Sequence, residues 1–89
     1  MLKGGNMKEQ QSEGKFGRVV TVLKPLRDGD AGELRVRIIE RSGARRLDIR
    51  PYVKTDKYTG YTPKGISLSL EEFDTLVSQR KKITKHLTP

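Results

Sequence analysis

The sequence predicts an α+β protein in which a four-stranded antiparallel β-meander is followed by one C-terminal α-helix. Residues 33–41 and 45–53 alternate apolar and charged side chains with the period of two that is typical of strands. Near the C-terminus, the apolar residues recur instead with the spacing of an α-helix. The links between the predicted strands are short, which favours antiparallel neighbours.

The chain begins with a segment that has little to bury. Residues 1–15 consist largely of Gly, Gln, Ser, Glu and Lys, a composition that cannot offset the entropy lost on folding. We therefore expect a disordered N-terminal arm over residues 1–15 and one folded domain over residues 16–89. The first strand is predicted at residues 16–23, which are rich in β-branched side chains. The Pro, Asp and Gly residues of segment 24–32 predict a loop.

The two alternating segments form the predicted centre of the sheet. The short Ser-Gly-Ala link at residues 42–44 joins them into a β-hairpin. A polar turn at residues 54–60 then leads to the fourth strand, predicted within residues 61–69. Each central segment directs its apolar side chains to one face and most of its charged side chains to the other. The apolar set consists of Leu34, Val36, Ile38, Leu47 and Ile49.

A capping box marks the start of the predicted helix. The hydroxyl of Ser69 can accept from a free backbone N–H, and the carboxylate of Glu72 can accept from the N–H of Ser69. Acidic residues follow in the first turns and basic residues in the last turns, which matches the sign of the helix macrodipole. The apolar stripe of the helix consists of Leu70, Phe73, Leu76, Val77, Ile83 and Leu87, with Arg80 interrupting it.

The core of such a small chain is thin. A single domain of 89 residues buries only about 60 % of the surface that its unfolded form exposes. The helix also has more apolar residues than one face needs against a small sheet, the surplus being Leu76, Val77, Ile83 and Leu87. We therefore expect a homodimer in which the second subunit supplies the missing core.

The charge balance points to an anionic partner. The chain has 19 Lys and Arg against 11 Asp and Glu, a net charge of +8. Most of the excess positive charge lies in residues 33–69, which contain nine basic and four acidic residues. A concentrated positive field of this kind attracts polyanions.

The chain lacks the residues that characterise several function classes. The chain has no cysteine and one histidine, His86, so we expect no disulfide, thiol nucleophile or metal site. The sequence contains no Gly-rich phosphate loop and no nucleophile elbow, so we expect neither an enzyme nor a cofactor. No apolar run approaches the roughly 20 residues of a membrane span. We expect a soluble intracellular protein, in the cytoplasm or nucleoid (the nucleus in a eukaryote), with no membrane contact.

Arginines occupy alternate positions on the second face of the predicted hairpin. Like charges on neighbouring strands destabilise a sheet, and the planar fork of arginine suits phosphate. The alternative is a solvated face on which the arginine stems cover the sheet, but the acidic residues nearby are too few to neutralise the row. These arginines are Arg35, Arg37, Arg46 and Arg50, and we expect their face to stay open because one helix covers only one side.

Flat aromatic groups are the second requirement for binding single-stranded nucleic acid. Tyr52, Tyr58 and Tyr61 lie in or beside the basic segment, and Tyr61 is the best stacking candidate because it begins the fourth strand near Lys64. Tyrosines at such positions also serve as core residues or as surface residues with a bonded hydroxyl. Because aromatics are few, we expect backbone contacts to dominate, with weak sequence preference and strong salt dependence.

Residues 47–52 (LDIRPY) and 63–69 (PKGISLS) form two short motifs separated by a polar turn and followed by the capped helix. In this order and spacing, they resemble the positive cofactor 4 transcriptional coactivator family over residues 33–83. The resemblance implies a homodimer that binds single-stranded or unwound DNA along its sheet, with helices and sheet edges at the dimer contact. It places Arg50 and Lys64 at basic DNA-contacting positions. Arg41 stands where family members often have an aromatic residue, which favours backbone contacts over stacking.

The sequence thus predicts a non-enzymatic, sequence-tolerant single-stranded DNA-binding protein with a coactivator-like role beside the transcription machinery. RNA binding stays open as an alternative, because only contacts with the 2′-OH would separate the two nucleic acids. A second alternative is an interaction module whose basic face docks an acidic protein partner. The expected contact residues are Arg35, Arg37, Arg41, Arg46, Arg50, Tyr61 and Lys64.

Overall fold

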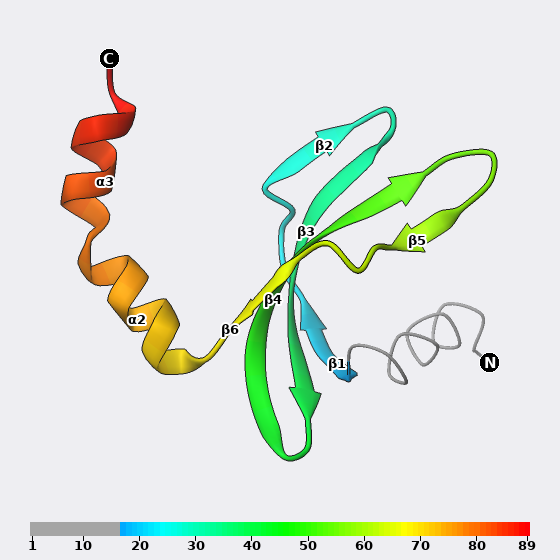
Figure 1. The fold of residues 1–89 in the computed structure, drawn as a ribbon, viewed down its shortest axis with the longest axis horizontal. Coiled ribbons are helices and arrows are strands. Elements are labelled where there is room, and N and C mark those ends of the chain that lie inside the picture. The colour runs from blue at the N-terminus through cyan, green and yellow to red at the C-terminus, as the bar shows by residue number, and fades with distance from the viewer. Residues whose placement is uncertain (1–16) are drawn as a thin grey trace.

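The computed structural model describes residues 17–89, and the predicted N-terminal arm and Phe16 lie outside this range. Within it, six strands are followed by two helices (Figure 1). The strands are β1 (Arg18–Val22), β2 (Arg27–Gly29), β3 (Gly32–Arg41), β4 (Ala44–Lys54), β5 (Thr59–Tyr61) and β6 (Ile66–Leu68), and the helices are α2 (Leu70–Ser78) and α3 (Arg80–Leu87).

Strands β3 and β4 form the long central hairpin of a curled antiparallel sheet (Figure 1). Strands β1 and β2 both pair with the outer edge of β3, while β5 and β6 both pair with the outer edge of β4. The sheet is therefore four strands wide, because β1 and β2 share one outer position and β5 and β6 share the other. Its strands follow the meander order that the sequence predicts. The protein is of the α+β class.

Each outer position of the sheet is occupied by two short strands with a gap between them, so the prediction of four continuous strands is wrong. Pro25 has no N–H to donate, and β1 and β2 lie on either side of it along β3, so that β2 falls within the predicted loop. At the outer edge of β4, the carbonyl oxygen of Pro51 accepts from the N–H of Thr62 (3.1 Å). Pro51 has no N–H to donate at this same edge, and the pairing is interrupted there between β5 and β6.

The turn between β3 and β4 fixes their register. Ser42 and Gly43 both have positive φ angles, 52° and 81°, as a two-residue type I′ hairpin turn requires. Arg37 consequently lies opposite Asp48, and such cross-strand partners share a face. We call the side formed by Glu33, Arg35, Arg37, Ile39, Arg41, Arg46, Asp48, Arg50 and Tyr52 the basic face, and the side formed by Leu34, Val36, Ile38, Leu47 and Ile49 the apolar face.

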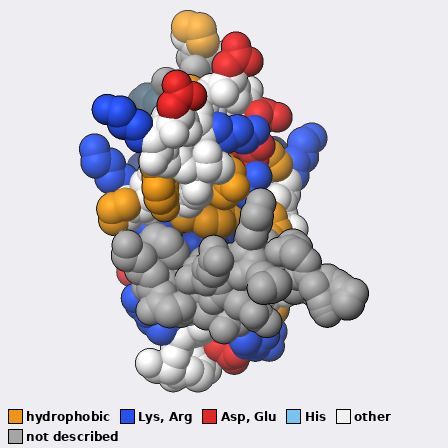
Figure 2. Space-filling view, turned by 90° about the vertical axis from the view of Figure 1, so that its right-hand side faces the viewer, with side chains coloured by type: hydrophobic (Ala, Val, Ile, Leu, Met, Phe, Trp, Pro, Cys, Tyr) orange, Lys and Arg blue, Asp and Glu red, His pale blue; other side chains and the backbone are white. Residues whose placement is uncertain are grey.

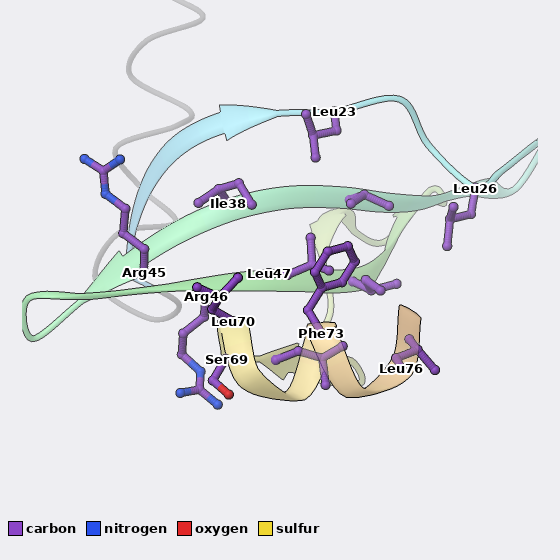
Figure 3. Close-up of a pocket in the computed structure, with 13 residues that line it drawn as sticks. Leu23, Leu26, Ile38, Arg45, Arg46, Leu47, Ser69, Leu70, Phe73 and Leu76 are labelled. Carbon is purple, nitrogen blue, oxygen red and sulfur yellow. The ribbon is translucent and has the colours of Figure 1, made fainter. Parts of the chain in front are cut away.

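The predicted capping box starts α2. The N–H of Glu72 donates to the hydroxyl of Ser69 (3.1 Å), and the N–H of Ser69 donates to the carboxylate of Glu72 (2.8 Å). Strand β6 leads directly into this helix, which lies along the apolar face with the ring of Phe73 pointing toward the sheet (Figure 3).

The prediction of one continuous helix is wrong at Gln79, where φ and ψ are −99° and 12°. The carbonyl oxygen of Thr75, the normal helical acceptor for the N–H of Gln79, instead accepts from the side chains of Ser78 (2.7 Å) and Gln79 (3.1 Å). The N–H of Gln79 donates to Leu76 and Val77. Competition by polar side chains thus ends α2 and separates it from α3.

Little apolar surface is fully buried. Among residues 17–89, Val36 and Ile39 are the only buried hydrophobic side chains. Several large apolar residues of the helices are exposed instead, as the expectation of a thin core requires. They are Leu70, Phe73, Leu76, Val77, Ile83 and Leu87.

Candidate nucleic-acid interface

A buried ionic cluster occupies the middle of the basic face. Arg37 Nε donates to Asp48 Oδ2 (2.8 Å), and Arg50 Nη2 donates to Asp48 Oδ1 (2.7 Å). Arg37 and Asp48 have 0 % exposure and Arg50 has 7 %. A charge so deeply buried is tolerated only when it is paired and hydrogen-bonded. One carboxylate therefore fixes two guanidinium groups, and this cluster keeps a positive excess.

Arg50 also fixes the segment that follows β5. Its Nη1 donates to the carbonyl oxygen of Thr62 (2.9 Å). The backbone at Gly65 passes so close to Arg50 that an added Cβ would lie 2.5 Å from the Cβ of Arg50 and 2.9 Å from its Cζ. Glycine is needed here for this close approach. The two contacts hold the segment that presents the exposed Lys64.

Two arginines and two tyrosines form a stack beside the ionic cluster. The Cζ of Arg35 lies 3.7 Å from the ring centroid of Tyr52, and the Cζ of Arg37 lies 3.7 Å from that of Tyr61. The two rings meet edge to face, with centroids 5.0 Å apart. These are cation–π contacts, and each covers a ring face that a nucleobase could otherwise use.

Arg35 is held at the end of this stack by a carboxylate. Its Nε donates to Glu33 Oε1 (2.7 Å), and Lys54 Nζ lies 3.5 Å from Glu33 Oε2. The hydrogen bond from Arg35 lowers the pKa of Glu33 below its ordinary value, although burial acts in the opposite direction. Burial lowers the pKa of Arg35, but the hydrogen bonds to Glu33 and Tyr61 outweigh it and raise the pKa above its ordinary value. Both groups stay charged at neutral pH.

The remaining predicted cations lie at the borders of the basic face. Arg46 donates from Nε to the hydroxyl of Ser67 (3.1 Å) and approaches Glu72 at 3.6 Å, while its side chain stays 36 % exposed. Arg41 is exposed where β3 ends at the hairpin turn. Figure 2 shows Lys and Arg side chains along both flanks of the described surface, with hydrophobic side chains between them.

The structure therefore divides the predicted contact residues into three groups. Arg35, Arg46 and Tyr61 are half-buried, and Arg41 and Lys64 are exposed. Arg37 and Arg50 are buried, so the expectation that the whole arginine row stays open is wrong for these two. The physical reason is Asp48, which draws both guanidinium groups inward.

The sequence patterns did not single out Asp48, although its carboxylate is central to this cluster. The strand register was the available signal, because it places Arg37 directly opposite Asp48. Thr62 and Gly65 were also missed as positioning residues. Their contacts depend on how the chain returns along β4, which no local pattern predicts.

An apolar groove of about 680 Å³ opens on the other side of the sheet, between the apolar face and α2 (Figure 3). Phe73 and Leu76 enter it from α2, and Leu23 and Leu26 from the segment between β1 and β2. Leu26 is 65 % exposed and Leu76 is 45 % exposed, so the chain does not close the groove by itself. Exposed apolar surface of this kind is common at interaction sites.

Comparison of the chain with protein-family models, with curated proteins and with solved structures finds no match. No helix within residues 17–89 is long and apolar enough to cross a membrane. The same residues contain no group of three or more His, Cys, Asp or Glu side chains that could hold a metal ion.

The Asp48→Asn variant tests the buried cluster. It leaves two buried guanidinium groups without their counter-charge, and we expect the free energy of unfolding to fall by about 3 kcal/mol. Urea denaturation followed by circular dichroism measures the change. Asp56→Asn, in the exposed turn between β4 and β5, is the control and should leave stability unchanged. Equal stability of Asp48→Asn and the parent chain would show that the cluster does not hold the sheet.

The lowered pKa of Glu33 predicts a pH-dependent contribution to stability. Because its pKa in the folded state lies below the ordinary value of 4.5, the ionised carboxylate stabilises the fold above that pH, and the contribution disappears as the pH falls through the folded-state pKa. Glu33→Gln should therefore be less stable than the parent chain at neutral pH, and the difference should vanish in acid. Urea denaturation across this range measures it, and a difference that grows toward acid would contradict the assignment.

Proposed function

We propose that the protein is a sequence-tolerant single-stranded DNA-binding protein that works as a homodimer, with a coactivator-type role beside the transcription machinery. The observation that carries the proposal is the basic face, where five guanidinium groups of two neighbouring strands accompany two carboxylates. These groups are Arg35, Arg37, Arg41, Arg46 and Arg50, against Glu33 and Asp48. A fixed positive surface of this kind suits a polyphosphate backbone.

The arrangement favours backbone contacts made by the accessible cations. Arg41 and Lys64 are exposed and Arg46 is partly exposed, so these three can reach phosphate oxygens directly. Arg37 and Arg50 act through their position, because they add positive potential and hold neighbouring groups in place. Since the rings of Tyr52 and Tyr61 already contact arginines, base stacking contributes little, and weak sequence preference follows.

Two further features support a single strand over a duplex. A helix that reads the major groove of a duplex must project from the binding surface, whereas α2 packs against the apolar face and, in the described chain, reaches the basic face only where Glu72 approaches Arg46. In addition, the two segments that resemble the positive cofactor 4 family pair with each other: Leu47 lies opposite Leu68, and Asp48 opposite Ser67. The resemblance thus concerns one continuous part of the sheet and supports a coactivator-type role.

The homodimer is supported by the apolar side of the molecule. The groove and the helices leave large hydrophobic side chains in contact with water, including Leu70 and Leu87. A second subunit would remove this surface from solvent while the basic face of each subunit stays available.

Fluorescence anisotropy with a labelled oligonucleotide tests the proposal. The parent chain should bind a single strand more tightly than the matching duplex, and its affinity should fall steeply with salt. The double variant Arg46→Ala/Lys64→Ala should lose about tenfold in affinity for all sequences alike. Its salt slope should be shallower by about 1.4, because two phosphate contacts are lost.

A charge-matched control separates the basic face from net charge. Lys24→Ala/Lys57→Ala removes two exposed cations outside that face and should bind almost as the parent does. Equal affinity for duplex and single strand, or equal losses in both double variants, would indicate generic attraction of polyanions. Tighter binding of a matched RNA would assign the protein to RNA, and absence of binding at low salt would favour an acidic protein partner.

A further inference from the structure

Tyr52 and Tyr61 are each covered by one arginine, but the two arginines are held in different ways. Arg37, whose Cζ lies 3.7 Å from the ring centroid of Tyr61, is fully buried and bonded to Asp48. Arg35, whose Cζ lies 3.7 Å from the ring centroid of Tyr52, keeps 27 % of its side chain exposed. The cover of Tyr61 is therefore part of the buried ionic cluster, whereas the cover of Tyr52 lies outside it.

The position of Arg35 depends on Glu33. The two residues lie two positions apart on β3 and therefore share a face, and Arg35 Nε donates to Glu33 Oε1 at 2.7 Å. Glu33 lies opposite Tyr52 in the strand register, so its carboxylate attracts the guanidinium toward this ring. Among the ion pairs of residues 17–89, Glu33 supplies the only carboxylate that pairs with Arg35.

Repulsion by Arg50 favours the same position. Arg35 and Arg50 lie directly opposite each other on β3 and β4, and like charges at such positions repel. The guanidinium of Arg50 is held in place, because it donates to Asp48 and to the carbonyl oxygen of Thr62. Arg35 therefore lies on the side away from the buried cluster, over Tyr52, where a cation–π contact stabilises it.

We propose that Glu33 makes DNA binding independent of the bases, because it holds Arg35 in the position over Tyr52 that a stacked base would occupy. This inference rests on the proposed single-stranded DNA-binding function and specifies how the strand is recognised. The ring of Tyr52 is otherwise suited to stacking, since it is half-buried on the basic face, among the cations that attract phosphates. Glu33 is thus a positioning residue, and Arg35 is the group that excludes the base.

Direct binding of a phosphate by Arg35 is the main alternative. Its Nε already donates to Glu33, and its Nη1 donates to the hydroxyl of Tyr61 (3.4 Å), so a phosphate would have to compete with these partners. Arg41 and Lys64 are exposed and offer phosphate contacts without this competition. The two roles of Arg35 differ in a measurable way: a phosphate contact acts on every strand, whereas exclusion acts only on strands that carry bases.

An abasic strand isolates the effect of the bases, because it carries the same phosphates as a normal single strand of equal length. Fluorescence anisotropy measures the affinity of the full chain for each strand, and the parent should bind the two about equally. Arg35→Ala should bind the base-bearing strand about tenfold more tightly than the abasic strand, since a base can then stack on Tyr52. Glu33→Ala should show a smaller preference of the same sign. The preference should disappear in Arg35→Ala/Tyr52→Leu.

Glu40→Ala is the matched control. Glu40 also accepts a hydrogen bond from an arginine, Arg18, but it lies outside the basic face. Its removal changes the net charge by the same amount as Glu33→Ala does. Glu40→Ala should therefore raise the affinity for both strands alike and leave their ratio unchanged.

NMR of the DNA-free chain tests the positioning step separately. The ring current of Tyr52 should shift the side-chain proton signals of Arg35 upfield in the parent, and these signals should return toward their ordinary positions in Glu33→Ala. Unchanged signals in that variant would overturn the role of Glu33.

The binding outcomes separate this inference from the function on which it rests. A parent that prefers the base-bearing strand, or an Arg35→Ala variant that binds both strands equally, would overturn the exclusion of bases and leave the DNA-binding function intact. A parent that binds neither strand would overturn the DNA-binding function, and the NMR signals of Arg35 would still decide whether Glu33 holds it over the ring.

Discussion

The sheet depends on one buried carboxylate. Asp48 has no exposed surface, and it accepts hydrogen bonds from guanidinium groups on β3 and β4. Because Arg37 and Arg50 could not be buried so close together without it, Asp48 permits a basic face with an ordered centre. Arg50 of this cluster also donates to the carbonyl oxygen of Thr62 and packs against the backbone at Gly65. These two contacts position the segment that contains Lys64.

The two sides of the sheet expose different kinds of surface, one charged and one hydrophobic. The basic face has more positive than negative groups, and its most accessible cations lie at its borders. The apolar side has a groove and two helices, α2 and α3, that expose more hydrophobic surface than a small chain normally leaves in water. A polyanion would neutralise the charge on one side, and a second copy would cover the hydrophobic surface on the other. The two partners would not compete for the same surface.

Local patterns predicted the parts of the fold that depend on neighbours in sequence. The alternation over β3 and β4, the tight turn at Ser42 and Gly43 and the capping box at Ser69 are all local, and the structure contains each of them. The interruptions of the outer strands occur at prolines that lack a backbone N–H, and the break at Gln79 depends on competing side-chain hydrogen bonds, so neither follows from periodicity. The burial of Arg37 and Arg50 escaped prediction because composition counts charges without showing which of them share a carboxylate.

In the proposed function, the basic face consists of a buried scaffold and accessible contact residues. The most direct test follows the side-chain Nε–H signals of the arginines by NMR while single-stranded DNA is added. We expect the signals of Arg41 and Arg46 to shift, whereas those of Arg37 and Arg50 stay in place because Asp48 holds both groups. Large shifts at Arg37 and Arg50 with unchanged signals at Arg41 and Arg46 would contradict it.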